Sequence, residues 1–174
     1  MMSEVLAWSY RTAEVPEAGL RQTRAATEAE RVQVAAALDV VSCERIEAEF
    51  TIRATGKGHY RLAGKVTARL TQSCVVTLDP LAQTAEGTFD VEFRPPAELP
   101  QNAEEEVEAL SAAELEPIEH GRIDVGRIVY ETLSAAIDPY PRKAGAEFAT
   151  DEAGGPLVGE GGPFAALKKL KDLG

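Results

Sequence analysis

Four side chains in this 174-residue sequence have the chemistry of a catalytic or metal-binding group. They are Cys43, Cys74, His59 and His120. A thiolate beside an imidazole base is the arrangement used by thiol enzymes. His59 lies next to a predicted hairpin turn, however, and His120 precedes a glycine in a predicted loop. We therefore interpret the histidines as exposed loop residues and both cysteines as small, half-buried core residues at strand ends.

The surroundings of Cys74 argue against a metal site. Thr77 stands three residues after it, where a zinc site would need a second cysteine. The chain also contains no glycine-rich phosphate loop. We expect no metal, no cofactor and no catalytic residue, and so a protein that is not an enzyme. A small thiol-dependent enzyme that uses Cys74 is the alternative from the residues alone.

Acidic side chains gather in one segment of the chain, which we interpret as an acidic loop at about residues 95–119. This segment holds eight acids and no base, which leaves 21 acids against 18 bases in the rest of the chain. It is either a solvated linker or a surface that attracts a basic protein. Its candidate contact residues are Glu104, Glu105, Glu106 and Glu108.

The charge distribution also bounds the partners. Nucleic-acid binding requires clustered lysine and arginine that neutralise phosphates, and the sequence shows no such cluster. The sequence does not rule out a small basic patch that forms only in the fold. No apolar run is long enough to cross a bilayer. The first residues lack the charged and apolar regions of a signal peptide, so we expect a cytoplasmic chain with reduced thiols and no membrane contact.

Alternating apolar and polar residues predict the centre of the fold. Three such stretches, at about 46–54, 60–70 and 88–93, are typical of antiparallel strands with one buried and one wet face. Gly56-Lys57-Gly58 suits the tight turn between the first two. Weaker patterns at 6–12 and 19–25 suggest further strands.

Two helices with apolar stripes flank these strands. Thr27 and Glu30 form a predicted capping box for a helix that runs to about Leu38. Asp124 is a predicted N-cap for a second helix, which Asp138-Pro139 ends. We predict one α+β domain over residues 1–143, in which the helices cover a curved, barrel-like antiparallel sheet.

Two further segments are candidate contact surfaces. The first is an elbow stiffened by Pro139 and Pro141, which is either a simple helix stop or a partner patch. Its polar tips belong to Tyr140, Arg142 and Lys143. The second is a short amphipathic helix at the end of a glycine-rich tether over residues 144–174, which either docks back on the domain or binds another protein. Its candidate contact residues are Phe164, Leu167 and Lys168.

Three blocks of sequence, taken together, resemble a known family. They read QSCVVTLDP at 72–80, GRIDVG at 121–126 leading to AIDPYPRK at 136–143, and PFAALKKLK at 163–171. Their order and spacing resemble the YceD family (DUF177), the large ribosomal RNA subunit accumulation proteins of bacteria and chloroplasts, and the alphaproteobacterial branch most. Cys74, Asp124 and Pro139 lie in these motifs.

The resemblance implies a non-enzymatic role in accumulation or processing of large-subunit (23S) ribosomal RNA and in ribosome assembly. The implied partner is a large-subunit ribosomal protein or an RNA-processing factor. Many family members carry a second cysteine where this chain has Thr77, so no metal or redox role of such a pair is carried over. A protein-binding adaptor unrelated to ribosomes stays an alternative.

Overall fold

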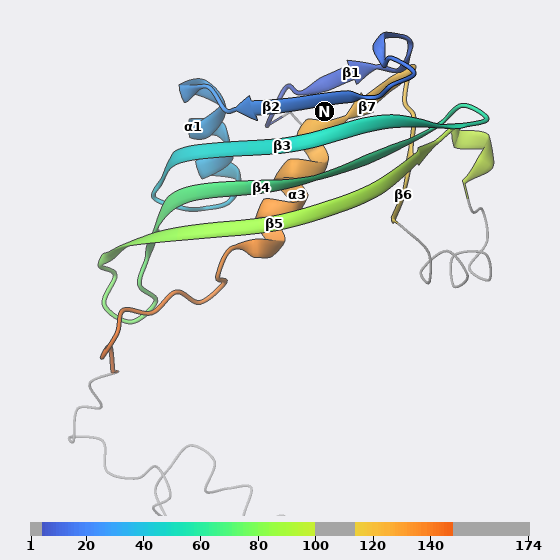
Figure 1. Cartoon of the computed structure of the whole chain (residues 1–174). Helices are drawn as coiled ribbons and strands as arrows, with labels where there is room; N and C mark the ends of the chain where they lie inside the picture. The colour runs from blue at the N-terminus through green and yellow to red at the C-terminus, as the bar shows by residue number, and fades with distance from the viewer. Residues whose placement is uncertain (1–4, 100–113, 148–174) are drawn as a thin grey trace, which may run out of the picture. The chain divides into compact units, whose positions relative to one another are not determined.

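The computed structural model describes residues 5–99 and 114–147 (Figure 1). The chain divides into two units, Met1–Lys143 and Ala144–Gly174, and the elements below belong to the first. No helix in the described ranges is long and apolar enough to cross a membrane.

A five-stranded sheet forms the centre of this unit, and it curls without closing into a barrel (Figure 1). All its strand pairs are antiparallel except the last, which is parallel. Its strands, in spatial order, are β2 (Leu20–Ala25), β3 (Ser42–Gly56), β4 (His59–Ser73), β5 (Pro80–Arg94) and β6 (Glu114–Pro117). A separate two-stranded sheet pairs β1 (Ser9–Arg11) with β7 (Arg122–Asp124). The predicted α+β class and curved antiparallel sheet are confirmed.

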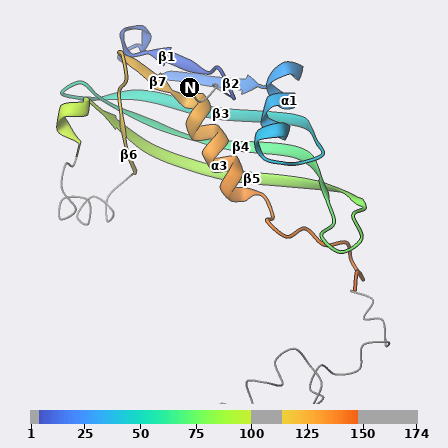
Figure 2. The same ribbon diagram turned by 180° about the vertical axis from the view of Figure 1, so that it is seen from behind.

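Two helices cover one face of the large sheet (Figure 2). In α1 (Glu28–Ala37) the predicted capping box is present: the Glu30 backbone N–H donates to the Thr27 hydroxyl, and the Thr27 N–H donates to the Glu30 carboxylate. In α3 (Val125–Ala136) the side chain of Asp124 accepts from the Arg127 N–H at 3.0 Å. The α3 stripe packs on β4 and β5, so the predicted cover is confirmed.

The N-terminal segment is part of the core, and the prediction of a weak edge strand at 6–12 is only partly confirmed. The strand is short and pairs with β7 rather than with the large sheet. Trp8 is fully buried, and its indole N–H donates to Glu30 Oε1 at 2.9 Å. Gly126 makes room for this segment, because a Cβ there would lie 2.0 Å from the Leu6 carbonyl oxygen.

The strand β5 is much longer than the predicted strand at 88–93. It begins at Pro80 and pairs with β4 along its whole length. The sequence pattern misses the first half because its inward positions include a polar Gln83, a small Ala85 and Gly87. Gly87 is needed there, since a Cβ would lie 2.6 Å from a methyl carbon of Thr132 in α3.

The prediction of an acidic loop throughout residues 95–119 is wrong at both ends of that segment. Pro96–Glu98 forms a 3-10 turn, and Glu114–Pro117 forms β6. The carboxylate of Glu98 contacts His59, and that of Glu116 contacts Arg127. Pairing with neighbours distant in sequence therefore orders these acids, which local composition does not reveal. Residues 104, 105, 106 and 108 lie outside the described ranges.

Candidate functional site at the sheet corner

Two segments that the sequence analysis singled out meet at one end of the sheet. They are the β4–β5 loop, residues 74–79, and the elbow after α3, residues 138–143. The Val75 N–H donates to the Pro141 carbonyl at 2.9 Å, and the side chain of Gln72 donates to the Asp138 carbonyl at 2.8 Å. We call these two segments together the corner.

Backbone hydrogen bonds within residues 74–79 hold the loop of the corner in shape. The Leu78 N–H donates to the Cys74 carbonyl at 2.9 Å, and the Cys74 N–H donates to the Asp79 carbonyl at 2.8 Å. Leu78 adopts a left-handed backbone with φ of 62°. An ion pair of 3.1 Å between Lys143 Nζ and Asp79 Oδ2 joins the loop to the elbow. The corner is thus held by several bonds rather than by one.

Cys74 lies beneath this junction and is fully buried. Its sulfur accepts from the Lys143 N–H at 3.3 Å and from the Thr77 N–H at 3.5 Å. The Thr77 hydroxyl, followed by the backbone N–H groups of Lys143, Thr77 and Val76, lowers the pKa of Cys74 to about 6, against the opposing effect of burial. The thiolate is therefore a hydrogen-bond acceptor that ties the elbow to the loop.

The corner carries exposed apolar side chains among exposed polar and charged ones such as Thr77 and Asp138. Leu78 is 77% exposed, Tyr140 is 72% exposed and Val75 is 40% exposed. The side chains of Arg142 and Lys143 are exposed beside them. Large apolar side chains that a folded domain leaves exposed together are typical of protein contact sites.

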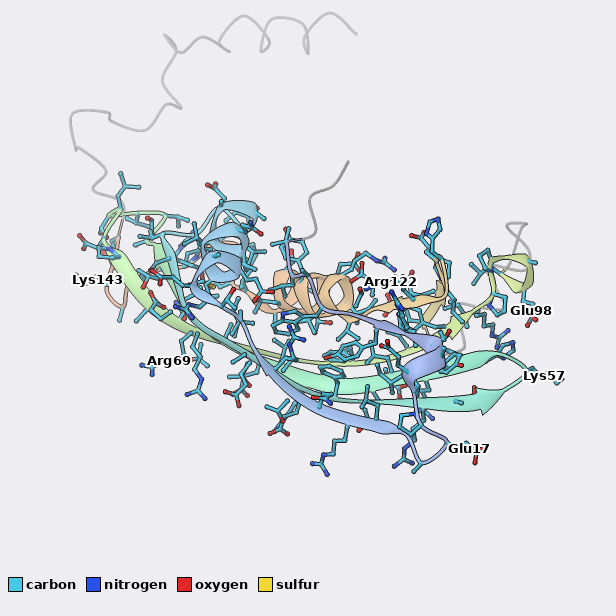
Figure 3. The ribbon with its side chains drawn as sticks, turned by 90° about the horizontal axis from the view of Figure 1, so that it is seen from above. Glu17, Lys57, Arg69, Glu98, Arg122 and Lys143 are labelled. Carbon is cyan, nitrogen blue, oxygen red and sulfur yellow. The ribbon has the colours of Figure 1, made fainter. Side chains whose placement is uncertain are left out.

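Both histidines lie far from Cys74. His59 opens β4 and Cys74 follows its end, so this 15-residue strand separates them by about 50 Å at roughly 3.3 Å per residue. His120 belongs to the turn between β6 and β7. The Ile118 N–H of this turn donates to the Arg94 carbonyl, so the turn lies at the same end of the sheet as His59. Figure 3 shows Lys143 at one end of the sheet and Lys57 and Glu98 at the other. No imidazole can serve as a base for this thiol.

His59 is not the exposed loop residue that the sequence predicts. Its side chain is 15% exposed and lies between two carboxylates, with Nδ1 3.4 Å from Glu92 and Nε2 in contact with Glu98. Strand pairing brings Glu92 beside it, and the Pro96–Glu98 turn brings Glu98. The histidine therefore links β4 to Glu92 of β5 and to Glu98 of the turn that follows β5.

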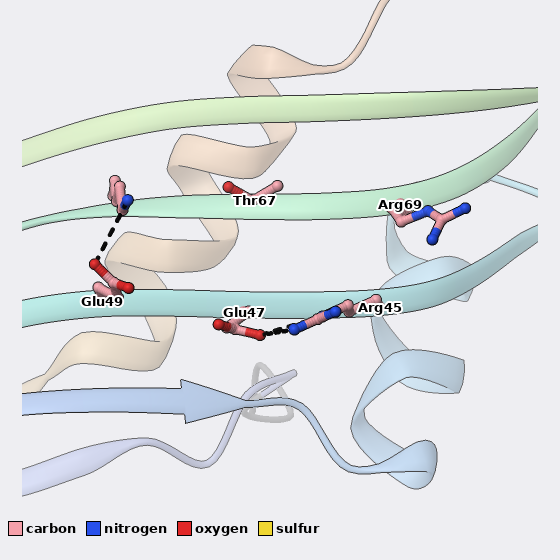
Figure 4. Close-up of a pocket in the computed structure, with 6 residues that line it drawn as sticks. Arg45, Glu47, Glu49, Thr67 and Arg69 are labelled. Carbon is pink, nitrogen blue, oxygen red and sulfur yellow. Dashed lines mark hydrogen bonds and ion pairs between the residues drawn. The ribbon is translucent and has the colours of Figure 1, made fainter.

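The outer face of the large sheet has a shallow hollow, which Figure 4 shows on the side away from the helices. Its charged lining is mixed: Arg45 pairs with Glu47, and Lys65 lies 3.5 Å from Glu49. Arg69 faces Arg45 across the β3–β4 pair. Neighbouring acids neutralise Arg45 and Lys65, so Arg69 alone does not form the continuous basic field that phosphate backbones require.

The remaining motif and contact residues have plain positions. Asp124 caps α3, and Pro139 is exposed just after the end of that helix. Phe164, Leu167 and Lys168 lie outside the described ranges, as do the four glutamates of the acidic segment. Within those ranges no three His, Cys, Asp or Glu side chains are grouped to hold a metal.

Sequence reasoning missed Val75 and Leu78 as surface residues. The available signal is a run of apolar residues, 74–76 and 78, that breaks the period of two between two strands. In the structure Cys74 is buried, while Val75 and Leu78 of the same run stay exposed.

The comparisons with known proteins add the family. Residues 62–171 match the family model described as large ribosomal RNA subunit accumulation protein YceD. Searches of curated proteins and of solved structures gave no match. The branch within the family stays a prediction. Because the match spans well over half of the chain and includes both segments of the corner, the chain belongs to the YceD family.

Proposed function

We propose that the protein is a non-enzymatic cytoplasmic factor that supports accumulation or processing of 23S ribosomal RNA and ribosome assembly by binding a protein partner at the corner. The observation that carries the proposal is the exposed apolar patch of Val75, Leu78 and Tyr140 on a frame fixed by hydrogen bonds. Both of its segments lie within the family match. The partner is a large-subunit ribosomal protein or an RNA-processing factor.

The surface chemistry supports a protein partner over direct contact with RNA. The patch offers apolar side chains, and one of the two neighbouring cations, Lys143, is paired with Asp79. On the outer sheet face, Arg61 pairs with Asp90 and Arg45 pairs with Glu47, while Arg53 and Arg69 form no ion pair with a described residue. Aromatic anchors with a charged rim are typical of protein interfaces, whereas RNA binding draws on unpaired cations.

The acidic residues supply a second part of the proposal. Residues 104, 105, 106 and 108 are all glutamate, and ribosomal proteins are generally basic. We expect these acids to attract such a partner and to shield it from premature contact with RNA. Attraction of this kind is screened over about 8 Å at physiological salt, so binding should weaken as salt rises.

Deletion and complementation test the proposal. In cells that encode the chain, deletion should lower the ratio of large-subunit to small-subunit ribosomal RNA or leave precursors. The wild-type gene should restore the ratio, and the double variant Leu78→Ser, Tyr140→Ala should not. Both side chains are more than 70% exposed, so the variant should keep the stability of the wild type.

A matched control uses exposed apolar residues elsewhere. Val32→Ser with Val41→Ser changes two side chains that are 65% and 59% exposed on and after α1. This control should restore the RNA ratio. Full rescue by the corner variant would remove the corner from the mechanism, while an unchanged ratio after deletion would remove the ribosomal role. In the second case, captured partners unrelated to ribosomes would favour the adaptor alternative.

The structure gives observations both for and against the alternative of a thiol enzyme. The lowered pKa of Cys74 favours a reactive thiolate. Its full burial and the distance of both histidines oppose catalysis. Alkylation by iodoacetamide at neutral pH distinguishes a catalytic from a structural thiol. Fast modification of Cys74 in the native protein would support an enzyme, and modification that occurs only after unfolding would count against one.

A further inference from the structure

Among the described residues, no strand lies beside the outer edge of β5 over most of its length. β5 pairs with β4 from Pro80 to Phe93, but β6 covers only residues 91–94, and no other described strand lies beside it. The Ile118 N–H donates to the Arg94 carbonyl at 2.8 Å, so the backbone of Arg94 faces the β6 side. Because strands alternate, the even-numbered residues from 82 to 90 direct their N–H and C=O groups to this open edge.

A groove of about 400 Å³ runs beside this edge. The second half of α3 forms its far wall, and Gly87 lets the helix approach β5 closely. On the helix side the lining includes the partly exposed Thr132, Ala135 and Ala136. A strand added to the edge would set every second side chain on this shallow, mostly apolar wall.

The groove is negatively charged, which favours a positively charged occupant. Among the described residues, its charged lining consists of Glu114 and Glu131. Glu86 precedes Gly87 on β5, with its side chain on the opposite face of the sheet edge. Glu131 contacts Arg127 at 3.3 Å, but Glu86 and Glu114 make no ion pair with any described residue. The site is therefore negative and is partly apolar.

We propose that the open edge of β5 and the α3 groove bind an extended segment of a basic partner protein as an added strand. The edge groups of residues 82–90 would pair with its backbone, as in β-augmentation. Its small or apolar side chains would rest on Ala135 and Ala136, and its lysines or arginines would face Glu114 and Glu131. The existing β6 already extends this edge, so the added strand continues an established pairing.

Charge disfavours the other two occupants. A second copy paired edge to edge would set Glu86 near the same acid of its partner, and like charges across strands repel. The residues of this chain that precede β6 include four glutamates within 104–108, which have the same sign as the groove. The inference rests on the groove alone and is tested with purified protein, so it stands or fails separately from the ribosomal role.

Amide hydrogen exchange followed by NMR tests the proposal on the full chain. In the free protein, the amides of Thr84, Glu86 and Thr88 should exchange faster than those of Gln83, Ala85 and Gly87, which pair with β4. A probe peptide of about ten residues that carries lysines and valines at every second position, with threonine between them, should slow exchange at the three even-numbered amides. A peptide with glutamate in place of the lysines should leave them unchanged.

Variants of matched charge locate the binding. Glu131→Lys should weaken binding of the lysine peptide about fivefold or more, while Glu17→Lys, before the opposite edge strand, should leave it unchanged. Unchanged exchange on adding the lysine peptide overturns the proposal. Slow exchange at the even-numbered amides of free monomer would show the chain's own segment in the edge, and slowing that follows protein concentration would show a second copy; either result also overturns it.

Discussion

At the scale of the residue, Cys74 shows how a buried thiol can be structural and still ionise. Its sulfur accepts two backbone N–H groups, one from its own loop and one from Lys143, far along the chain. Charged acceptors strengthen such bonds. The low pKa thus follows from bonds that hold the corner together, which explains the ionisation without any catalytic role.

This arrangement predicts a pH dependence of stability. The pKa of Cys74 is about 6 in the folded protein, against an ordinary value of 9.0. Between these values the unfolded chain binds a proton that the folded chain does not, so stability should rise with pH and be lost as pH falls through about 6. In urea denaturation, the excess stability of wild type over Cys74→Ser should grow from pH 6 to pH 9.

Cys43→Ser is the control for that experiment. Burial, with a smaller effect of Glu44, raises the pKa of Cys43, so this thiol cannot stabilise the fold as a thiolate over the same range. The Cys43→Ser protein should keep the rise with pH. An excess that is equal at the two pH values would show that the Cys74 thiolate does not tie the corner.

Asp124 is a residue from the family motif with a structural task. Its carboxylate accepts from the Arg127 N–H and satisfies one free donor at the start of α3. Asp124→Ala should lower the free energy of unfolding by about 1 kcal/mol. Asp124→Ser, which keeps a capping oxygen, should recover most of that loss, and an equal loss in both variants would contradict the cap.

At the scale of the element, the crossing of the N-terminal segment over α3 depends on one missing side chain. The Gly126 N–H donates to the Trp8 carbonyl at 2.9 Å, and the Leu6 backbone lies directly against the glycine. This contact fixes Trp8 in the core, where Arg24 stacks 5.3 Å from its ring. A short segment without much regular structure is therefore an integral part of the packing.

Gly126→Ala tests that contact. The new Cβ would lie 2.0 Å from a backbone oxygen, so the segment must move and Trp8 with it. We expect a loss of about 2 kcal/mol or more in the free energy of unfolding, with a change in tryptophan fluorescence. Ser134→Ala, on the exposed side of α3, is the control and should change stability little.

At the scale of the whole molecule, one apolar core joins the sheet, both helices and the N-terminal segment. Ile46, Leu62 and Val91 of the central strands meet Val129 and Leu133 of α3 in it. The core is mostly aliphatic, and the curl of the sheet wraps it on one side (Figure 3). The wet face carries charged side chains, some of them paired, and contributes little to burial.

Substitutions of buried and of exposed helix residues should therefore differ strongly in their effect on stability. Ile128→Ala removes a side chain that is 2% exposed and should cost about 2–5 kcal/mol of unfolding free energy. Val32→Ala, at a position that is 65% exposed, should stay within about 0.5 kcal/mol of wild type. Equal losses in denaturant would mean that α3 does not cover this core.

The sequence by itself determined the features that depend on neighbours along the chain. A period of two placed β3 and β4, and the Thr27 and Asp124 caps needed only residues three positions away. The turn at Gly56 and the stop at Pro139 follow from backbone angles. The two prolines identified the elbow, and the resemblance pointed to the loop after Cys74, but neither showed that the two segments meet.

Tertiary structure decided everything that depends on residues far apart. Pairing with β4 makes a strand of the weakly patterned first half of β5, and parallel pairing with β5 makes a strand of Glu114–Pro117. Trp8 reaches the core, and Cys74 meets Lys143, only after the sheet and α3 are in place. Such contacts leave no period in the sequence, because their energy comes from burial and hydrogen bonds between segments that the chain alone does not bring together.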